Sequence, residues 1–254
     1  MARDDHYVSQ AYLRGFVGPT GDIVPYYKDA QVIVGRPKKP KSICFETEGD
    51  RCKYLPEPRA VDRFLPVFEN RWKSNVAEVK NRRLDPNVRL ELCGYIAYLR
   101  TCNPAAKRLG QQMIAGTLQP IAYREMMRDL DTDTTLAAEP KIRLREAIQD
   151  KKISIKIDRE FAHAQNLAAL IGILSRIYCS YWLVMVNDSD IPFITSDNPA
   201  ILYRTHRDQR SAGMYVPLTP EIALLVSPDS DAGKPDLDAE VVPFSVGGAV
   251  TTPR

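Results

Sequence analysis

Two short polar stretches hold the residues best suited to chemistry. The first, "HYVSQAYLRGF" at residues 6–16, places His6, Gln10 and Arg14 four residues apart. A helix over residues 6–16 would line these side chains up on one face. Imidazole, amide and guanidinium groups together are suited to receiving a phosphate or another anion. The alternative interpretation is a solvated helix face near a chain terminus.

The second stretch is "PFITSDNPA" at residues 192–200, where Asp197 follows a predicted strand. A carboxylate at the end of a strand can bind a metal ion or act as a base. A purely structural interpretation is also open. Pro199 restricts Asn198 to extended geometry, and Asp197 can then accept backbone hydrogen bonds in a turn.

Two charged residues fall on apolar faces of predicted helices. Glu69 lies between Phe68 and Trp72, and Arg100 follows Leu99. A charge on a buried face normally needs a partner, so the two residues either pair, lie at the rim of the core or line a polar pocket.

The remaining histidines give no comparable signal. His163 is expected to be a hydrogen-bonded core residue, and His206 a surface residue. With only three histidines in the chain, a histidine-rich metal site is not expected. No nucleophile elbow, phosphate-binding loop or dinucleotide-binding glycine motif is present.

Composition narrows the class of protein. The 35 basic and 32 acidic side chains give a net charge of +3, too small a field to indicate nucleic-acid or membrane binding. Five cysteines without a C-x-x-C pair indicate reduced thiols. Arg176 interrupts the apolar stretch 167–186, which is therefore not expected to span a membrane. We expect a cytoplasmic protein.

Periodicity predicts an α+β fold with an N-terminal helix and β-hairpin, a central helical region and a C-terminal antiparallel sheet. We expect one domain over 1–254, helical at about 60–180 and β-rich at about 181–250. Helices are predicted at 6–16, 64–84, 85–103, 105–116, 122–133, 138–150 and 158–180. Strands are predicted at 23–27, 31–35, 181–188, 192–197, 200–205, 214–220, 222–228 and within 241–254, with 36–66 irregular and 153–158 a strand or extended arm.

The two polar stretches together resemble the domain-of-unknown-function 4238 family. That family is recognised by His-aromatic-Val-x-Gln-x-Tyr-Leu-Arg-x-Phe and by Phe-x-Thr-Ser-Asp-Asn-Pro, which match residues 6–16 and 193–199. Ser9 departs from the proline usual in the family, and relatives run on past position 254 through another strand. The resemblance implies no reaction. It implies that His6, Gln10, Arg14, Glu69, Arg100, Asp197 and Asn198 meet in one pocket.

These observations lead to two hypotheses from different classes. The first is a hydrolase acting on a phosphate-containing substrate, either a nuclease or a phosphodiesterase. His6 would be the acid or base, Asp197 with Glu69 would hold a divalent metal ion or activate water, and Arg14 and Arg100 would stabilise negative charge. Gln10 and Asn198 would bind substrate, which would be nucleic acid or a phosphorylated small molecule. The second is a non-enzymatic binding or interaction module in which the same residues form a structural polar network.

Overall fold

The N-terminal segment is a short strand followed by a short helix. The structure is a computed structural model that describes residues 2–27, 36–205, 208–227 and 240–244. Strand β1 (Asp4–His6) pairs antiparallel with β2 (Phe45–Thr47). Helix α1 (Gln10–Leu13) begins only after Ser9, whose hydroxyl accepts a hydrogen bond from the Tyr12 amide at 3.2 Å. The predicted helix over 6–16 is therefore wrong at its start, and His6 belongs to a strand.

The chain between α1 and the central helices is mostly irregular, as predicted for 36–66, whereas the strand predicted at 23–27 is wrong, since these residues form only isolated bridges. It contains the 3₁₀ helices η1 (Arg14–Phe16) and η3 (Pro40–Ser42) as well as β2. Of the predicted hairpin, the strand at 31–35 lies outside the described residues. Within the described part, Ile23 pairs with Lys38 in an isolated antiparallel bridge.

The central region begins with three helices that pack on one another. The helix predicted at 64–84 is two helices, α2 (Val61–Glu69) and α3 (Trp72–Lys80). Helix α4 (Pro86–Thr101) starts as predicted, because Asp85 accepts hydrogen bonds from the amides of Asn87 and Val88 and Pro86 occupies the first turn.

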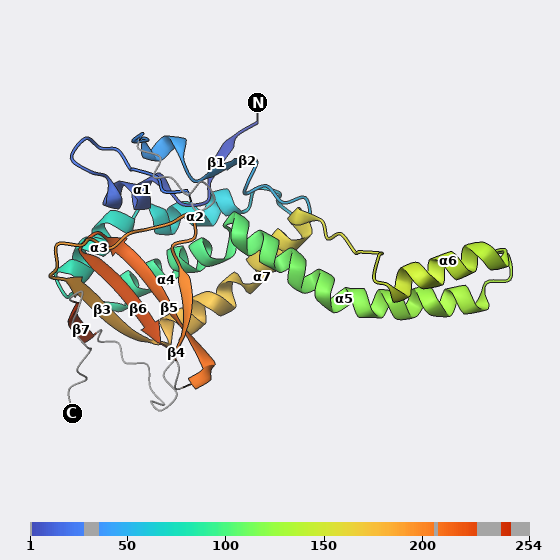
Figure 1. The fold of residues 1–254 in the computed structure, drawn as a ribbon. Helices are drawn as coiled ribbons and strands as arrows, with labels where there is room; N and C mark the ends of the chain where they lie inside the picture. Colours follow the sequence, from blue (N-terminus) through green and yellow to red (C-terminus); the bar gives the residue numbers. More distant parts are fainter. Residues whose placement is uncertain (1, 28–35, 206–207, 228–239, 245–254) are drawn as a thin grey trace.

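The distal part of helix α5 (Pro104–Thr132) and helix α6 (Ala138–Gln149) project from the rest of the molecule as an arm (Figure 1). The two helices predicted at 105–116 and 122–133 are one helix, which continues through Pro120. The chain returns as an extended segment rather than a strand. Gln119 holds that segment by donating to the Ile153 carbonyl and accepting from the Ile155 amide.

The last helix, α7 (Arg159–Tyr178), leads directly into the main sheet. Its strands are β3 (Tyr181–Asn187), β4 (Ile201–Thr205), β5 (Asp208–Thr219), β6 (Ile222–Ser227) and β7 (Glu240–Phe244). The spatial order is β4-β5-β6-β3-β7. The first four strands are antiparallel neighbours as predicted, whereas β7 lies parallel to β3. The strand predicted at 192–197 is wrong, since these residues form the loop between β3 and β4.

One cluster of buried side chains joins the helices to the sheet. It runs from Tyr12 through α2, α3, α4 and α7 to Trp182 and Leu218. Arg89, fully buried in α4, donates to the carbonyls of Tyr178 and Ser180 and lies over the Trp182 ring. The α+β class is therefore confirmed. Because this core is continuous, we infer one domain.

Candidate functional site

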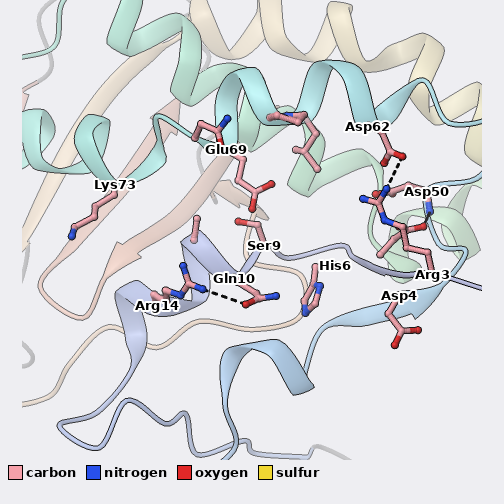
Figure 2. A pocket seen from close by; sticks show the side chains of 15 residues that line it. Arg3, Asp4, His6, Ser9, Gln10, Arg14, Asp50, Asp62, Glu69 and Lys73 are labelled. Carbon is pink, nitrogen blue, oxygen red and sulfur yellow. Dashed lines mark hydrogen bonds and ion pairs between the residues drawn. The ribbon is translucent and has the colours of Figure 1, made fainter.

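A cavity of about 530 Å³ lies between the N-terminal segment and α2 (Figure 2). Three sources supply its wall: β1 with the turn into α1, α2 with the start of α3, and the turn after β2. The lining residues are Arg3, Asp4, Asp5, His6, Ser9, Gln10, Ala11, Arg14, Asp50, Asp62, Leu65, Pro66, Glu69, Asn70 and Lys73. Four of the sequence-predicted site residues, His6, Gln10, Arg14 and Glu69, are among them.

Glu69 is the half-buried last residue of α2, and its carboxyl group faces the cavity (Figure 2). Burial raises its pKa above the usual value. A hydrogen bond from the Ser9 hydroxyl and the charges of His6 and Arg14 act in the opposite direction. Glu69 is therefore a carboxyl group poised to take up or release a proton nearer to neutral pH than an exposed glutamate.

Ser9 connects Glu69 to the buried core. Its hydroxyl oxygen accepts a hydrogen bond from the Tyr95 hydroxyl at 2.7 Å and one from the Tyr12 amide at 3.2 Å. Because a serine hydroxyl has a single proton, that proton is left for the Glu69 carboxylate. Ser9 and Tyr95 are almost fully buried, so the carboxyl group is held by a rigid support.

His6 and the α1 helix supply the facing wall. The Nε2 atom of His6 lies 3.3 Å from the Lys41 carbonyl oxygen, which can only accept, so Nε2 carries a proton. The Nδ1 atom is then the ring nitrogen available for proton transfer. Arg14 donates to the Gln10 amide oxygen at 3.3 Å, one helical turn away, as the four-residue spacing predicted.

The other end of the cavity holds a network of ion pairs. Arg59 and Arg3 both bind Asp5 and Asp62, at distances of 2.7 to 3.2 Å. Asp50, almost fully buried, accepts a hydrogen bond from the Tyr98 hydroxyl at 3.1 Å. Burial raises the pKa of Asp50 to about 6.

The Thr-Ser-Asp-Asn-Pro loop contacts a different part of the N-terminal segment. Thr195 hydrogen-bonds to the Tyr12 hydroxyl at 2.8 Å, and Asn198 accepts from the Asn103 amide at 2.9 Å. Asp197 is exposed. Burial raises the pKa values of Tyr7 and Cys44, and the charge of Asp197 adds to this effect. Neither Asp197 nor Asn198 lines the cavity.

Arg100 is also absent from the cavity lining. It is half-buried near the end of α4, where burial lowers its pKa. The charges that act on Glu69 come from His6 and Arg14 and not from Arg100. The pairing of Glu69 with Arg100 considered from the sequence is therefore not observed.

The other polar candidates have structural surroundings. His163 is buried as expected, and neither ring nitrogen has a hydrogen-bond partner of normal geometry. Burial, together with the charges of Lys107 and Arg159, lowers its pKa to about 3, while a contact with the Asp50 backbone acts in the opposite direction. His206 lies outside the described residues. Among the described residues no three His, Cys, Asp or Glu side chains are close enough to hold a metal ion.

Sequence reasoning missed several residues of the cavity, chiefly Asp50, Ser9 and Lys73. Lys73 follows the buried Trp72 in α3, so an amphipathic helix count alone places it on the solvent side. Asp50 lies in an irregular stretch with no periodicity. The ion-pair network was not foreseeable either, because Asp5 and Arg59 are 54 residues apart.

None of the helices in the described part of the chain is long and apolar enough to cross a membrane.

Comparison with known proteins gives one match. The family model described as "Protein of unknown function (DUF4238)" matches residues 5–246. No curated protein and no solved structure matches the chain significantly. Because the family model covers nearly the whole chain, the protein belongs to the DUF4238 family.

Proposed function

We propose that the cavity is the active site of a hydrolase acting on a phosphate-containing substrate. The observation that carries the proposal is Glu69, a carboxyl group with a raised pKa facing His6 and Arg14 in an open cavity. A carboxyl group whose pKa is raised above its usual value is better suited to general acid-base catalysis than an ordinary one.

The proposed step is the attack of water on phosphorus. Glu69 takes a proton from the water as its oxygen forms the new bond to phosphorus. The bond from phosphorus to the leaving oxygen breaks, and His6, which enters the step as an imidazolium with a proton on each ring nitrogen, gives that oxygen the proton of Nδ1. Arg14 and Lys73 stabilise the negative charge on the phosphoryl oxygens. Gln10 orients Arg14 through their hydrogen bond.

The choice between nuclease and phosphodiesterase stays a prediction, as do the divalent metal ion and the roles of Asp197, Asn198 and Arg100. A cytoplasmic location belongs to the same proposal. It is supported by the five cysteines, all of which are free thiols.

The test is a cleavage screen with and without Mg²⁺ or Mn²⁺. Substrates are single-stranded RNA, single-stranded DNA, bis-p-nitrophenyl phosphate and p-nitrophenyl phosphate. We expect Glu69→Gln and His6→Ala each to lower cleavage by about 10²- to 10⁴-fold, the usual contribution of a general acid or base. Glu139→Gln, an exposed carboxylate on α6, is the matched control.

Circular dichroism separates lost activity from lost folding. Wild-type protein that cleaves none of these substrates, or Glu69→Gln protein that retains full cleavage, contradicts the proposal. Cleavage that depends on Asp197 but not on Glu69 would move the active site to the loop between β3 and β4.

One observation favours a non-enzymatic role for the loop between β3 and β4. Thr195 and Asn198 form direct hydrogen bonds to Tyr12 and Asn103, both fully buried. These contacts support the interpretation of the loop motif as a structural network that joins the N-terminal segment and α5 to the sheet.

A further inference from the structure

A basic segment precedes β2 at the outer edge of the N-terminal part of the molecule (Figure 1). Residues 36–45 contain no acidic side chain but four basic ones, Arg36, Lys38, Lys39 and Lys41. Lys39 forms an ion pair with Asp22 at 3.0 Å. The other three form no ion pair within the described part of the chain. Three cations are therefore left without a carboxylate and can bind a negatively charged partner.

Exposed tyrosines lie beside these cations. Tyr26 and Tyr27 are 69% and 42% exposed. The backbones of Ile23 and Lys38 exchange two hydrogen bonds of 2.8 and 2.9 Å, which brings the two segments together. Lys38 Nζ donates to the Tyr27 hydroxyl at 2.9 Å and lies 5.6 Å from the centre of its ring. We call residues 23–27 and 36–41 the tyrosine-lysine surface.

The tyrosine-lysine surface is continuous with the cavity. The Lys41 carbonyl oxygen lies 3.3 Å from His6 Nε2, and His6 lines the cavity. Phe45, which is 39% exposed, lies beside the same histidine with the ring centres 5.7 Å apart. Because Lys38 and Lys41 are three residues apart, their Cα atoms are separated by at most about 11 Å. A ligand that leaves the cavity past His6 therefore reaches Phe45 and Lys41 first and then the tyrosines.

Exposed rings alternating with cations are suited to an unpaired strand of nucleic acid. Bases of a single strand stack on aromatic side chains, while lysine and arginine bind the phosphates between them. A duplex keeps its bases stacked on one another and cannot offer them to the rings. The net charge of +3 gave no such signal, because acidic residues elsewhere in the chain offset this local group of cations.

We propose that the tyrosine-lysine surface binds a single strand of nucleic acid, one end of which enters the cavity. A base stacks on Tyr26, and phosphates contact Arg36, Lys38 and Lys41. This inference rests on the proposed function, because it assigns the cavity to a phosphodiester of the same strand. It narrows the substrate class from phosphate-containing molecules to single-stranded nucleic acid.

The test measures the fluorescence anisotropy of labelled ten-nucleotide strands, oligouridylate and oligothymidylate. The titrated protein carries Glu69→Gln, so that no strand is cleaved during the titration, and circular dichroism checks its fold. With three phosphate contacts, we expect the dissociation constant to rise roughly twentyfold between 50 and 200 mM salt. At 150 mM salt, a ten-base-pair duplex and poly-glutamate should each bind about tenfold more weakly, because neither offers an unstacked base.

Further substitutions in the same protein separate stacking from charge. Tyr26→Ala should raise the dissociation constant about five- to hundredfold, whereas Tyr26→Phe keeps the ring and the affinity. Lys41→Gln should lower the slope of log Kd against log salt concentration by about 0.7. The matched controls are Tyr54→Ala, at a tyrosine 48% exposed, and Arg124→Gln, at an exposed arginine on α5; neither should change the affinity.

Equal binding of the strands and of poly-glutamate, or an unchanged affinity in Tyr26→Ala, overturns the inference. If no strand binds while wild-type protein cleaves bis-p-nitrophenyl phosphate in a Glu69-dependent way, this inference fails and the proposed function stands. If the strands bind with the expected dependence on Tyr26 and salt but wild-type protein cleaves no substrate, the binding surface stands and the hydrolase does not.

Discussion

Glu69 and Asp50 are carboxyl groups with raised pKa values that both line the cavity. They differ in the neighbouring groups that act on their charged forms. Glu69 receives the Ser9 proton and faces two positive side chains, so its charged form is partly stabilised. Asp50 is more deeply buried, which raises its pKa; the charge of Lys107 acts in the opposite direction, and the negative charge of Asp5 adds to the effect of burial. Asp50 is therefore the group whose ionisation should cost the folded state most.

The pKa of Asp50 rises from 3.8 to about 6 on folding. Between these values the folded protein binds a proton that the unfolded chain has released, so the free energy of unfolding falls as pH rises through this window. The difference corresponds to roughly 3 kcal/mol. We expect Asp50→Asn to flatten the fall in stability between about pH 4 and pH 7, measured by urea unfolding. Asp129→Asn is the control, and an unchanged pH profile in Asp50→Asn contradicts the assignment.

At the scale of elements, helix packing decides whether a glycine-to-alanine substitution raises or lowers the free energy of unfolding. Gly94 in α4 faces Phe68 of α2, and a Cβ atom at position 94 would lie 2.3 Å from the Phe68 ring. Gly116 in α5 has no neighbouring atom within 4 Å of such a Cβ. Intrinsic helix propensity favours alanine at both positions, so only the packing distinguishes them.

Gly94→Ala and Gly116→Ala therefore form a matched pair. We expect Gly94→Ala to lower the free energy of unfolding by about 1 to 3 kcal/mol because the ring must move. Gly116→Ala should raise it by about 0.5 to 1 kcal/mol. Urea denaturation measures both, and a shift of the same sign in the two variants would show that α2 and α4 do not pack as described.

At the scale of the whole molecule, the loop between β3 and β4 joins parts distant in sequence. The Tyr12 hydroxyl donates to the Pro217 carbonyl at 2.7 Å and also contacts Thr195. Asn103, which caps α5 by accepting from the Ala106 amide, donates to both Leu99 and Asn198. The loop thereby ties the N-terminal segment, the start of α5 and the sheet together.

Asn198→Ala removes one of these ties while Asn103 keeps its bond to the Leu99 carbonyl at 2.6 Å. We expect a loss of stability of about 0.5 to 1.5 kcal/mol, the usual contribution of one hydrogen bond. Thermal unfolding followed by circular dichroism measures the loss. Ile194→Ala, in the same loop but with a side chain 81% exposed, should change stability little. Equal losses of stability in the two variants would show that the hydrogen bond between Asn103 and Asn198 does not stabilise the fold.

The sequence by itself determined what depends on a few neighbouring residues. Asp85 and Pro86 marked the start of α4, and the change from helical to alternating periodicity near residue 180 marked the start of the sheet. The four-residue spacing of Gln10 and Arg14 also predicted their contact. Helix capping and hydrophobic periodicity depend only on neighbouring residues, so they can be recognised without knowledge of the fold.

Only the tertiary structure decided which polar residues meet. It placed His6 in a strand, brought Asp50 and Lys73 into the cavity, and left Asp197, Asn198 and Arg100 outside the lining. It also showed that α5 continues through Pro120. Because Pro120 is exposed, water can bind the backbone carbonyl that the missing proline N–H leaves without a helical partner. The convergence of side chains from β1, α1, α2 and the turn after β2 depends on packing between distant segments, for which a single sequence carries no local signal.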